Sequence, residues 1–353
     1  MLLAGMPRDS WPRIALLTAL VACSSNRNAS SSLDGGTPDD SGTTRLDAGT
    51  AAPGHQLATL ATLGGATYIM RIDSANAYVA SGNSDSSLFQ IPLAGGAPTR
   101  LASGQHSVPG LAVNGTTVYW VDSYLSNSEP PDAGPDGVVR SVPVGGGTTA
   151  TLASGQRYPG TLAVDSTGAY WTTGGPCSGA TACPANVMTV PLGGGTPVAL
   201  ASVTGSLPVS IALDAVNVYW GTGDGRLMKV AKTGGTPTML AFYQARIQSL
   251  AVDAASVYWT TGTGDIMKTP IGGGASVAIL VSQDEMADLT IDSTSVYFTT
   301  IGYPTSNVKK MSLIGGPPTT LWSGAAVPEA IEVDATSVYF VTESGVLMKV
   351  TPK

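Results

Sequence analysis

The chain offers few side chains that catalyse reactions or bind metals. Its 353 residues include two histidines, His55 and His106, and three cysteines. Neither an HExxH zinc motif nor a GxxxxGK phosphate loop occurs in the sequence. The glycine-rich segment 221–225 (GTGDG) lies between two expected strands, so it predicts a hairpin turn and not a phosphate site. These observations assign no catalytic residue and predict neither a metal nor a cofactor.

Two of the cysteines, Cys177 and Cys183, flank the short segment CSGATAC. The surrounding GPCSG has the outline of a nucleophile elbow, but neither a strand–turn–helix pattern nor an evident base accompanies it. Cysteines this close together in an exported protein favour a local disulfide. We therefore expect Cys177 and Cys183 to be bonded to each other.

Aspartates occupy one place in five repeated phrases and could be mistaken for a ring of metal ligands. Each is expected in a tight turn, where a carboxylate accepts hydrogen bonds from backbone N–H groups, so capping explains them without a metal. The acidic segment 126–137 could hold Ca²⁺ through Asp132 and Asp136, but its spacing fits no established calcium loop and favours a solvated insertion. The five aspartates are Asp165, Asp214, Asp253, Asp292 and Asp334.

The elements that must position these residues form an internal repeat. One unit contains four strand-like runs, at 249–253, 256–262, 265–271 and 276–282. Since side chains alternate along a strand, Tyr258 and Trp259 are expected to pack against different neighbouring units. A period of about 40 residues with four short strands is typical of β-propeller blades. The repeated tyrosines, spaced by 39–51 residues, are Tyr78, Tyr119, Tyr170, Tyr219, Tyr258, Tyr297 and Tyr339.

The number of units predicts how the ring closes. Seven units carry the first three runs, but only six of them are followed by a fourth. The segment 56–63 (QLATLATL) has the pattern of a fourth run, so we expect it to pair with the last three runs and hide the sheet edges. The prediction is an all-β, seven-bladed β-propeller over residues 56–353. The first run is expected nearest the axis because it carries a small residue, at Ala112, Ala163, Ala212 and Ala251.

The phrases VYWTT (257–261) and VYWVD (118–122) resemble the YWTD-type repeats of lipoprotein-receptor ectodomains, and also TolB-like and lactonase-like bacterial propellers. Only Asp122 occupies the last place of the YWTD motif, and the receptor domains have six blades, so the resemblance implies the fold alone. Lactonase-like propellers bind a metal through carboxylates and asparagines at the axis, and streptogramin lyases use histidines on a seven-bladed ring. The residues that could serve such an enzyme here are His106, Asp284 and Glu285.

The N-terminal residues predict export. Arg8 and Arg13 precede an apolar run at 14–22, which is too short to span a bilayer and is typical of a secretory signal. The sequence LVAC at its end resembles the lipobox of bacterial lipoproteins. That resemblance implies cleavage of residues 1–22 and attachment of lipid to Cys23.

The segment that follows is expected to be a flexible tether. Residues 23–55 are rich in Ser, Thr, Asp, Gly and Pro and contain little that could be buried. Ser24 follows the lipobox cysteine, a pattern that goes with the outer membrane in enterobacterial lipoproteins. We therefore expect an exported protein, anchored by lipid to the outer membrane or cell surface.

The net charge of the protein limits the kinds of partner that it can bind. Seventeen basic residues against twenty-four acidic ones give a net charge of −7, so no basic footprint for nucleic acid exists. Repeats, tether and the lack of catalytic groups favour a membrane-anchored extracytoplasmic binding or scaffold module, with an envelope protein or a carbohydrate as partner. The alternatives are a lactonase-like or lyase-like enzyme with its site at the axial channel, and a purely structural envelope protein.

Ligand contacts are expected at one end of the ring. There the connections are irregular, whereas the Asp and Gly turns of the other end repeat from unit to unit. Among the residues of these irregular connections, we expect Tyr158, Tyr243 and Arg246 at the mouth of the axial channel. The candidate ligand-binding residues are His106, Tyr158, Tyr243, Arg246, Asp284 and Glu285.

Overall fold

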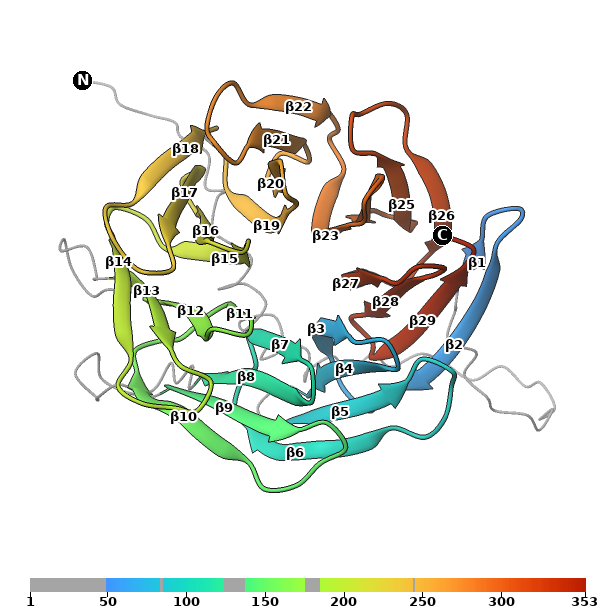
Figure 1. Cartoon of the computed structure of the whole chain (residues 1–353). Coiled ribbons are helices and arrows are strands. Elements are labelled where there is room, and N and C mark those ends of the chain that lie inside the picture. Colours follow the sequence, from blue (N-terminus) through green and yellow to red (C-terminus); the bar gives the residue numbers. More distant parts are fainter. Residues whose placement is uncertain (1–48, 83–84, 124–136, 175–184, 244) are drawn as a thin grey trace, which may run out of the picture. The chain divides into compact units, whose positions relative to one another are not determined.

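Seven antiparallel sheets stand around a common axis, as the repeated four-strand unit predicts (Figure 1). The computed structural model describes residues 49–82, 85–123, 137–174, 185–243 and 245–353. Within these ranges, no helix is long and apolar enough to cross a membrane. The predicted signal peptide, Cys23, Cys177, Cys183, Asp132 and Asp136 lie outside the described residues, so those expectations stay predictions.

Each sheet is one blade, whose strands are named from the innermost outwards. Blade 1 consists of β3 (Thr67–Ile72), β4 (Asn76–Ser81), β5 (Ser86–Pro92) and β6 (Thr99–Gln105). Blade 2 consists of β7 (Gly110–Asn114), β8 (Thr117–Ser123), β9 (Gly137–Pro143) and β10 (Ala150–Gln156). Blade 3 consists of β11 (Leu162–Val164), β12 (Ala169–Thr173), β13 (Ala185–Val190) and β14 (Val198–Val203). Blade 4 consists of β15 (Pro208–Leu213), β16 (Asn217–Thr222), β17 (Arg226–Ala231) and β18 (Thr238–Phe242).

The last three blades include the two N-terminal strands. Blade 5 consists of β19 (Ile247–Val252), β20 (Ser256–Thr261), β21 (Ile266–Pro270) and β22 (Val277–Leu280). Blade 6 consists of β23 (Glu285–Ile291), β24 (Ser295–Ile301), β25 (Ser306–Ser312), β26 (Thr319–Gly324) and β1 (Thr50–Ala51). Blade 7 consists of β27 (Pro328–Val333), β28 (Val338–Thr342), β29 (Val346–Thr351) and β2 (Gln56–Thr62).

The ring closes as the sequence predicts. Strand β2 is the outermost strand of blade 7 and pairs antiparallel with β29, from Gln56 opposite Thr351 to Thr62 opposite Val346. Figure 1 shows these two strands, blue and red, side by side. Ala61 is buried in the core between blades 7 and 1. Every innermost strand contacts the innermost strand of the next blade, including β27 and β3, so the ring is continuous around the axis.

A fifth strand in blade 6 corrects one boundary. Strand β1 pairs with β26 and lies within the stretch predicted to be a tether, so the ordered ring begins before Gln56. Gly49 has φ +67° and lies against Trp322, where an added Cβ would stand 2.6 Å from the ring. A larger residue at position 49 therefore has no room, and the glycine allows β1 to cover the buried Trp322.

Tyrosine and tryptophan of the repeat fill different interfaces, as the alternation predicts. Tyr258 packs with Met286 and Leu289 of blade 6, whereas Trp259 packs with Tyr219 of blade 4. Both aromatic side chains of β20 are fully buried. Burial of each such side chain stabilises the fold by about 1.5–3 kcal/mol, so the aromatic pair holds a blade to both of its neighbours. Blade 1 has Val79 in the second place of the pair, and this side chain is also buried.

Lysines on the third strand of several blades bond to the next blade. Lys229, Lys268 and Lys310 donate through Nζ to backbone carbonyls in the following blade, at 2.6, 3.3 and 3.3 Å. Lys268 and Lys310 also lie over the tyrosine rings of their own blades, at 5.0 and 5.5 Å from the ring centroids. We call these three lysines the latch lysines, because each bonds its own blade to the next one. The carbonyls that accept from them belong to Ile271, Leu313 and Lys353.

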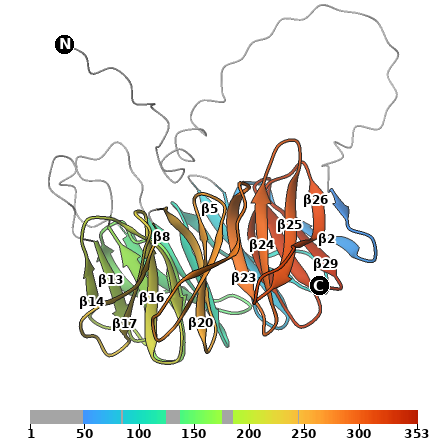
Figure 2. The ribbon, with the colours of Figure 1, turned by 90° about the horizontal axis from the view of Figure 1, so that it is seen from above.

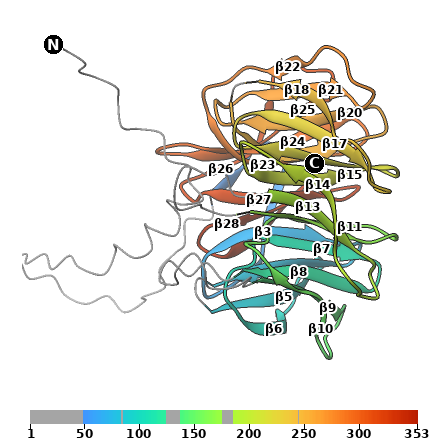
Figure 3. The same cartoon turned by 90° about the vertical axis from the view of Figure 1, so that its left-hand side faces the viewer.

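The ring has two ends with different connections. In every blade the strands run from one end of the ring to the other, as Figure 2 and Figure 3 show. The connections between the first and second strands and between the third and fourth strands lie at one end, which we call the turn end. The connections between the second and third strands, and those from one blade to the next, lie at the opposite end, which we call the loop end.

Candidate functional site

The turn end is built from a repeated pair of aspartate and tyrosine. In blade 5, Oδ1 of Asp253 accepts hydrogen bonds from the backbone N–H groups of Ala255 and Ser256, each at 2.7 Å. Its Oδ2 accepts from the Tyr258 hydroxyl at 3.0 Å. The same Asp–Tyr bond joins Asp73 to Tyr78, Asp214 to Tyr219, Asp292 to Tyr297 and Asp334 to Tyr339.

These bonds explain the aspartates as turn caps. Burial alone would raise the pKa of Asp334, but hydrogen bonds from Thr336, Tyr339 and Ser337 lower it below its ordinary value. Among the described residues, no group of three or more His, Cys, Asp or Glu side chains could hold a metal ion. The capping prediction is confirmed, and the carboxylates are occupied by the protein itself.

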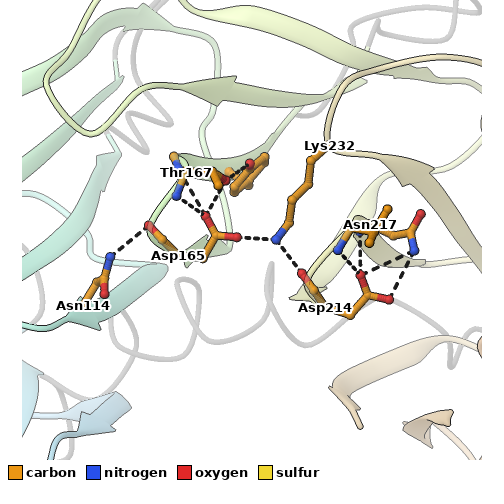
Figure 4. Close-up of polar contacts among 9 residues, drawn as sticks. Asn114, Asp165, Thr167, Asp214, Asn217 and Lys232 are labelled. Atoms are coloured by element: carbon orange, nitrogen blue, oxygen red, sulfur yellow. Dashed lines mark hydrogen bonds and ion pairs between the residues drawn. The ribbon is translucent and has the colours of Figure 1, made fainter. Parts of the chain in front are cut away.

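Blade 3 departs from the pattern in a way that Figure 4 shows. Here Tyr170 bonds to Thr167 instead of the aspartate, at 2.7 Å. The second oxygen of Asp165 accepts instead from Lys232, which also donates to the backbone carbonyl of Asp214 in blade 4. Lys232 thus joins two neighbouring turns and replaces the missing tyrosine bond.

The loop end holds all six candidate ligand-binding residues. Five of them lie in the connections from one blade to the next, and Glu285 is the first residue of β23. They are spread over four such connections, so the structure brings them to one end of the ring and not into one cluster. By connection, they are His106 between blades 1 and 2, Tyr158 between blades 2 and 3, Tyr243 and Arg246 between blades 4 and 5, and Asp284 between blades 5 and 6, with Glu285 next to it at the start of β23.

His106 belongs to a charged group at the loop end. The backbone N–H of this exposed residue donates to Oδ1 of Asp122 at 2.9 Å, and its Nδ1 lies 3.5 Å from the same oxygen. Arg140 faces the other oxygen of Asp122 at 3.7 Å, which is longer than a hydrogen bond. The Asp122 carboxylate is buried, so this group orients His106 at the surface of the ring.

The two tyrosines differ in position and strain. Tyr158 has φ +40°, which makes it the one non-glycine residue of the described chain in the left-handed region. It precedes the innermost strand β11. Tyr243 follows the outermost strand β18, and its hydroxyl donates to Asp265 at 2.9 Å, a bond that raises the pKa of Tyr243. Tyr243 is therefore placed away from the axis, whereas Tyr158 and Arg246 lie beside innermost strands.

A polar group near the axis was not predicted from the sequence. Arg71 on β3 and Glu332 on β27 form an ion pair at 3.3 Å across blades 1 and 7. Asp288 on β23 accepts from the Ser249 hydroxyl of blade 5 at 2.6 Å and from the Ile331 N–H of blade 7 at 3.2 Å. The axial cluster of Arg71, Ser249, Asp288 and Glu332 therefore links four consecutive blades.

The sequence did contain a signal for this cluster. The position opposite the repeated tyrosine on each innermost strand is alanine in blades 2 to 5 but differs in the other three. Charged or larger side chains stand there in blades 1, 6 and 7, and these are Arg71, Thr290 and Glu332. The innermost strands that lack alanine at this position therefore belong to the blades that bring charged side chains to the axis.

Glu332 is the titratable group of this cluster. Burial raises its pKa to about 7, and the nearby Asp288 adds to the rise, although Arg71 opposes it. Its side chain keeps 19% of its surface exposed, so it is not fully enclosed. Glu332 therefore changes charge near neutral pH.

The sequence matches no known family model, and a search of curated proteins finds no match. Solved structures share the fold. Virginiamycin B lyase from Staphylococcus aureus superposes with a TM-score of 0.65 at 13% identity, covering 85% of this chain and 99% of that one. YCF48 bound to D1 peptide has a TM-score of 0.62 at 10% identity, covering 87% and 98%. The computationally designed Ika8 protein has a TM-score of 0.58 at 15% identity, covering 84% and 98%. At these identities the likeness concerns the propeller fold.

Proposed function

We propose that the protein is an exported binding module of the bacterial cell envelope, anchored to the membrane through lipid on Cys23, which holds a protein or peptide partner on its loop end. The observation that carries the proposal is the contrast between the two ends. The turn end repeats an aspartate-capped turn in six of the seven blades, whereas the loop end presents side chains found in single blades. Rigid rings that display variable connections on one end are suited to binding.

Exposed aromatic side chains at the loop end support a macromolecular partner. Tyr303, in the connection between β24 and β25, is fully exposed, and Phe242, at the end of β18, is 53% exposed. Tyrosine is enriched among interface residues that dominate binding energy. The similarly folded YCF48 has been solved with a bound D1 peptide, which supports a peptide partner for a ring of this kind.

The placement of the two histidines favours binding over lyase-like catalysis. His106 lies at the loop end between blades 1 and 2. His55 lies at the turn end, where its Nδ1 contacts the carbonyl oxygen of Pro352 at 2.7 Å. Histidines at opposite ends of a ring cannot act on one substrate.

Site-specific photo-crosslinking in the native envelope tests the binding end. A photoreactive phenylalanine analogue replaces Tyr303 or Phe242 at the loop end, or Ile314 or Val216 at the turn end. The turn-end positions are matched controls because they are 87% and 64% exposed. We expect one protein adduct, identified by mass spectrometry, from the loop-end positions only, and weaker formation when Tyr158 is changed to alanine.

Adducts that form equally from both ends, or from the turn end alone, contradict the proposal.

The lipid anchor on Cys23 is tested in a separate experiment. Metabolic labelling with a palmitate analogue should modify the wild-type chain and leave Cys23→Ala unlabelled. Labelling of that variant, or cleavage of the precursor elsewhere, would refute the lipid anchor without affecting the assignment of the binding end.

A further inference from the structure

One half-buried arginine at the loop end lacks the partner that comparable arginines have. Within the described residues, the side chain of Arg246 makes no hydrogen bond or ion pair, and its Nε is shielded from solvent. The other partly buried arginines each face a carboxylate. These pairs are Arg71 with Glu332 at 3.3 Å, Arg140 with Asp122 at 3.7 Å and Arg226 with Asp224 at 2.9 Å.

A second unpartnered group stands two residues further along. Oε1 of Gln248 is buried and accepts no hydrogen bond from the part of the chain that the structure describes. Gln248 belongs to β19, the innermost strand of blade 5, where the register shifts between Ile247 and Leu250. Such a bulge turns side chains out of the regular ladder. The loop end therefore has a donor and an acceptor near the axis for which the described chain supplies no partner.

Arg246 and Gln248 both lower the stability of the unliganded ring. Burial lowers the pKa of the Arg246 guanidinium, because its charge has lost hydration that no carboxylate of the described chain replaces. Buried charges are normally paired, and a lone buried acceptor loses the hydrogen bond that water would give. An arrangement that weakens the fold in this way is typical of a site that is completed by a ligand.

We infer that Arg246 and Gln248 form a subsite for a carboxylate that carries an N–H group close by, as in an N-acyl amino acid or the end of a peptide chain. This inference rests on the proposed function, because it names the chemistry that the loop end recognises. The planar guanidinium offers parallel N–H donors that match the two oxygens of a carboxylate. Oε1 of Gln248 then accepts from the neighbouring N–H.

The charges around this end favour a monoanion. Burial raises the pKa of Tyr68 at the start of β3, and the nearby carboxylates of Glu329 and Glu343 raise it further. Glu285 occupies the start of the innermost strand in the blade after Arg246. With these carboxylates near the axis and a net charge of −7, a dianion such as sulfate is repelled more strongly than a carboxylate.

Small probes test the subsite on the full-length protein by calorimetry or NMR titration. N-acetyl-alanyl-alanine should bind at least about tenfold more tightly than its C-terminal amide, because the amide lacks the carboxylate that pairs with the Arg246 guanidinium. Arg246→Gln should remove this difference, and Arg246→Lys should restore part of it. Arg226→Gln, which changes a paired arginine at the same end, should leave binding unchanged.

The role of Gln248 has its own probe pair. Replacing the last amide N–H of the probe by an ester oxygen should weaken binding to the wild-type protein. Gln248→Leu should bind the amide and ester probes equally, since the acceptor for that N–H is gone. An unchanged preference in Gln248→Leu would overturn this assignment.

Stability supplies a readout that needs no ligand. Arg246→Met should raise the melting temperature of the unliganded protein by roughly 2 °C, because it removes an unpaired charge from a partly buried position. Equal affinity for acid and amide, tighter binding of sulfate than of the carboxylate probe, or a lower melting temperature for Arg246→Met would each overturn the inference. A loop-end crosslink that persists in Arg246→Gln would overturn the subsite and leave the proposed function standing.

Discussion

The two ends of the ring use the same kinds of residues for opposite purposes. At the turn end, an aspartate is saturated by its own turn and by a tyrosine, as Asp253 is by Tyr258. At the loop end, Asp284 is 52% exposed and pairs with Lys309, and Arg246 meets no carboxylate of the described chain. The comparison indicates that the repeat supplies stability at one end and leaves the other end free to differ from blade to blade.

The largest effect is expected from opening the ring, because closure holds both ends in place. Deletion of residues 56–62 removes β2 and exposes the edge of β29. We expect the free energy of unfolding to fall by more than about 4 kcal/mol, measured by urea denaturation. Deletion of Thr50 and Ala51, which pair over two residues only, is the control and should cost less. An unchanged midpoint for the first deletion would contradict closure by β2.

The next test compares one aspartate from each end. Asp253→Ala leaves two turn N–H groups and the Tyr258 hydroxyl without their acceptor. It should lower the free energy of unfolding by about 2–3 kcal/mol, whereas Tyr258→Phe should cost about 1 kcal/mol. Asp284→Ala removes an exposed ion pair and should cost less than about 0.5 kcal/mol. Similar losses at the two ends would contradict the difference between them.

The dependence of stability on pH separates the turn caps from the axial cluster. The pKa of Asp334 is lower in the fold than in the unfolded chain, so its contribution is present above about pH 4 and is lost as pH falls further. The pKa of Glu332 is raised to about 7, so stability is lost as pH rises from about 4.5 through 7. We expect maximal stability near pH 5 and a decline towards pH 8.

Urea denaturation of Glu332→Gln at pH 5 and pH 8 tests this sign. The variant should lose the decline, which we expect to be about 1–2 kcal/mol because the side chain is partly exposed. Arg71→Gln is the control and should enlarge the decline, since Arg71 lowers the pKa of Glu332. A decline of the same size in Glu332→Gln would show that another group causes it.

The smallest change in stability is expected at Tyr158. Asparagine enters the left-handed region more readily than tyrosine, so Tyr158→Asn should alter the free energy of unfolding by less than about 0.5 kcal/mol. It should nevertheless weaken the loop-end crosslink. Gly273→Ala at the turn end, where φ is +89°, is the converse control. It should cost about 1 kcal/mol and leave the crosslink intact, and the reverse outcome would mean that the wrong end was chosen.

The fold was predictable because its signals are local and repeated. Strand alternation placed Tyr258 and Trp259 in different interfaces, and the unit that lacked a fourth strand predicted closure by residues 56–63. The strand at Thr50 was missed because a two-residue strand in a polar stretch has no pattern. The pairs Arg71–Glu332 and Asp122–Arg140 were missed because partners 261 and 18 residues apart depend on ring geometry. The lipid on Cys23 and the disulfide between Cys177 and Cys183 remain predictions.

The hydrogen bonds of the latch lysines have a consequence for how such rings can arise. Blades 5 and 6 each give a lysine to the blade that follows and a carbonyl to the blade that precedes, as blade 5 does through Lys268 and Ile271. A gene duplication that places a copy of such a unit beside its parent therefore brings both halves of the new contact with it. Interfaces in repeat proteins are nearest-neighbour terms, so the copy would contact its parent unit in the same way that neighbouring blades already contact each other. The Asp–Tyr turn of blade 5 lies within the same unit and is copied with it.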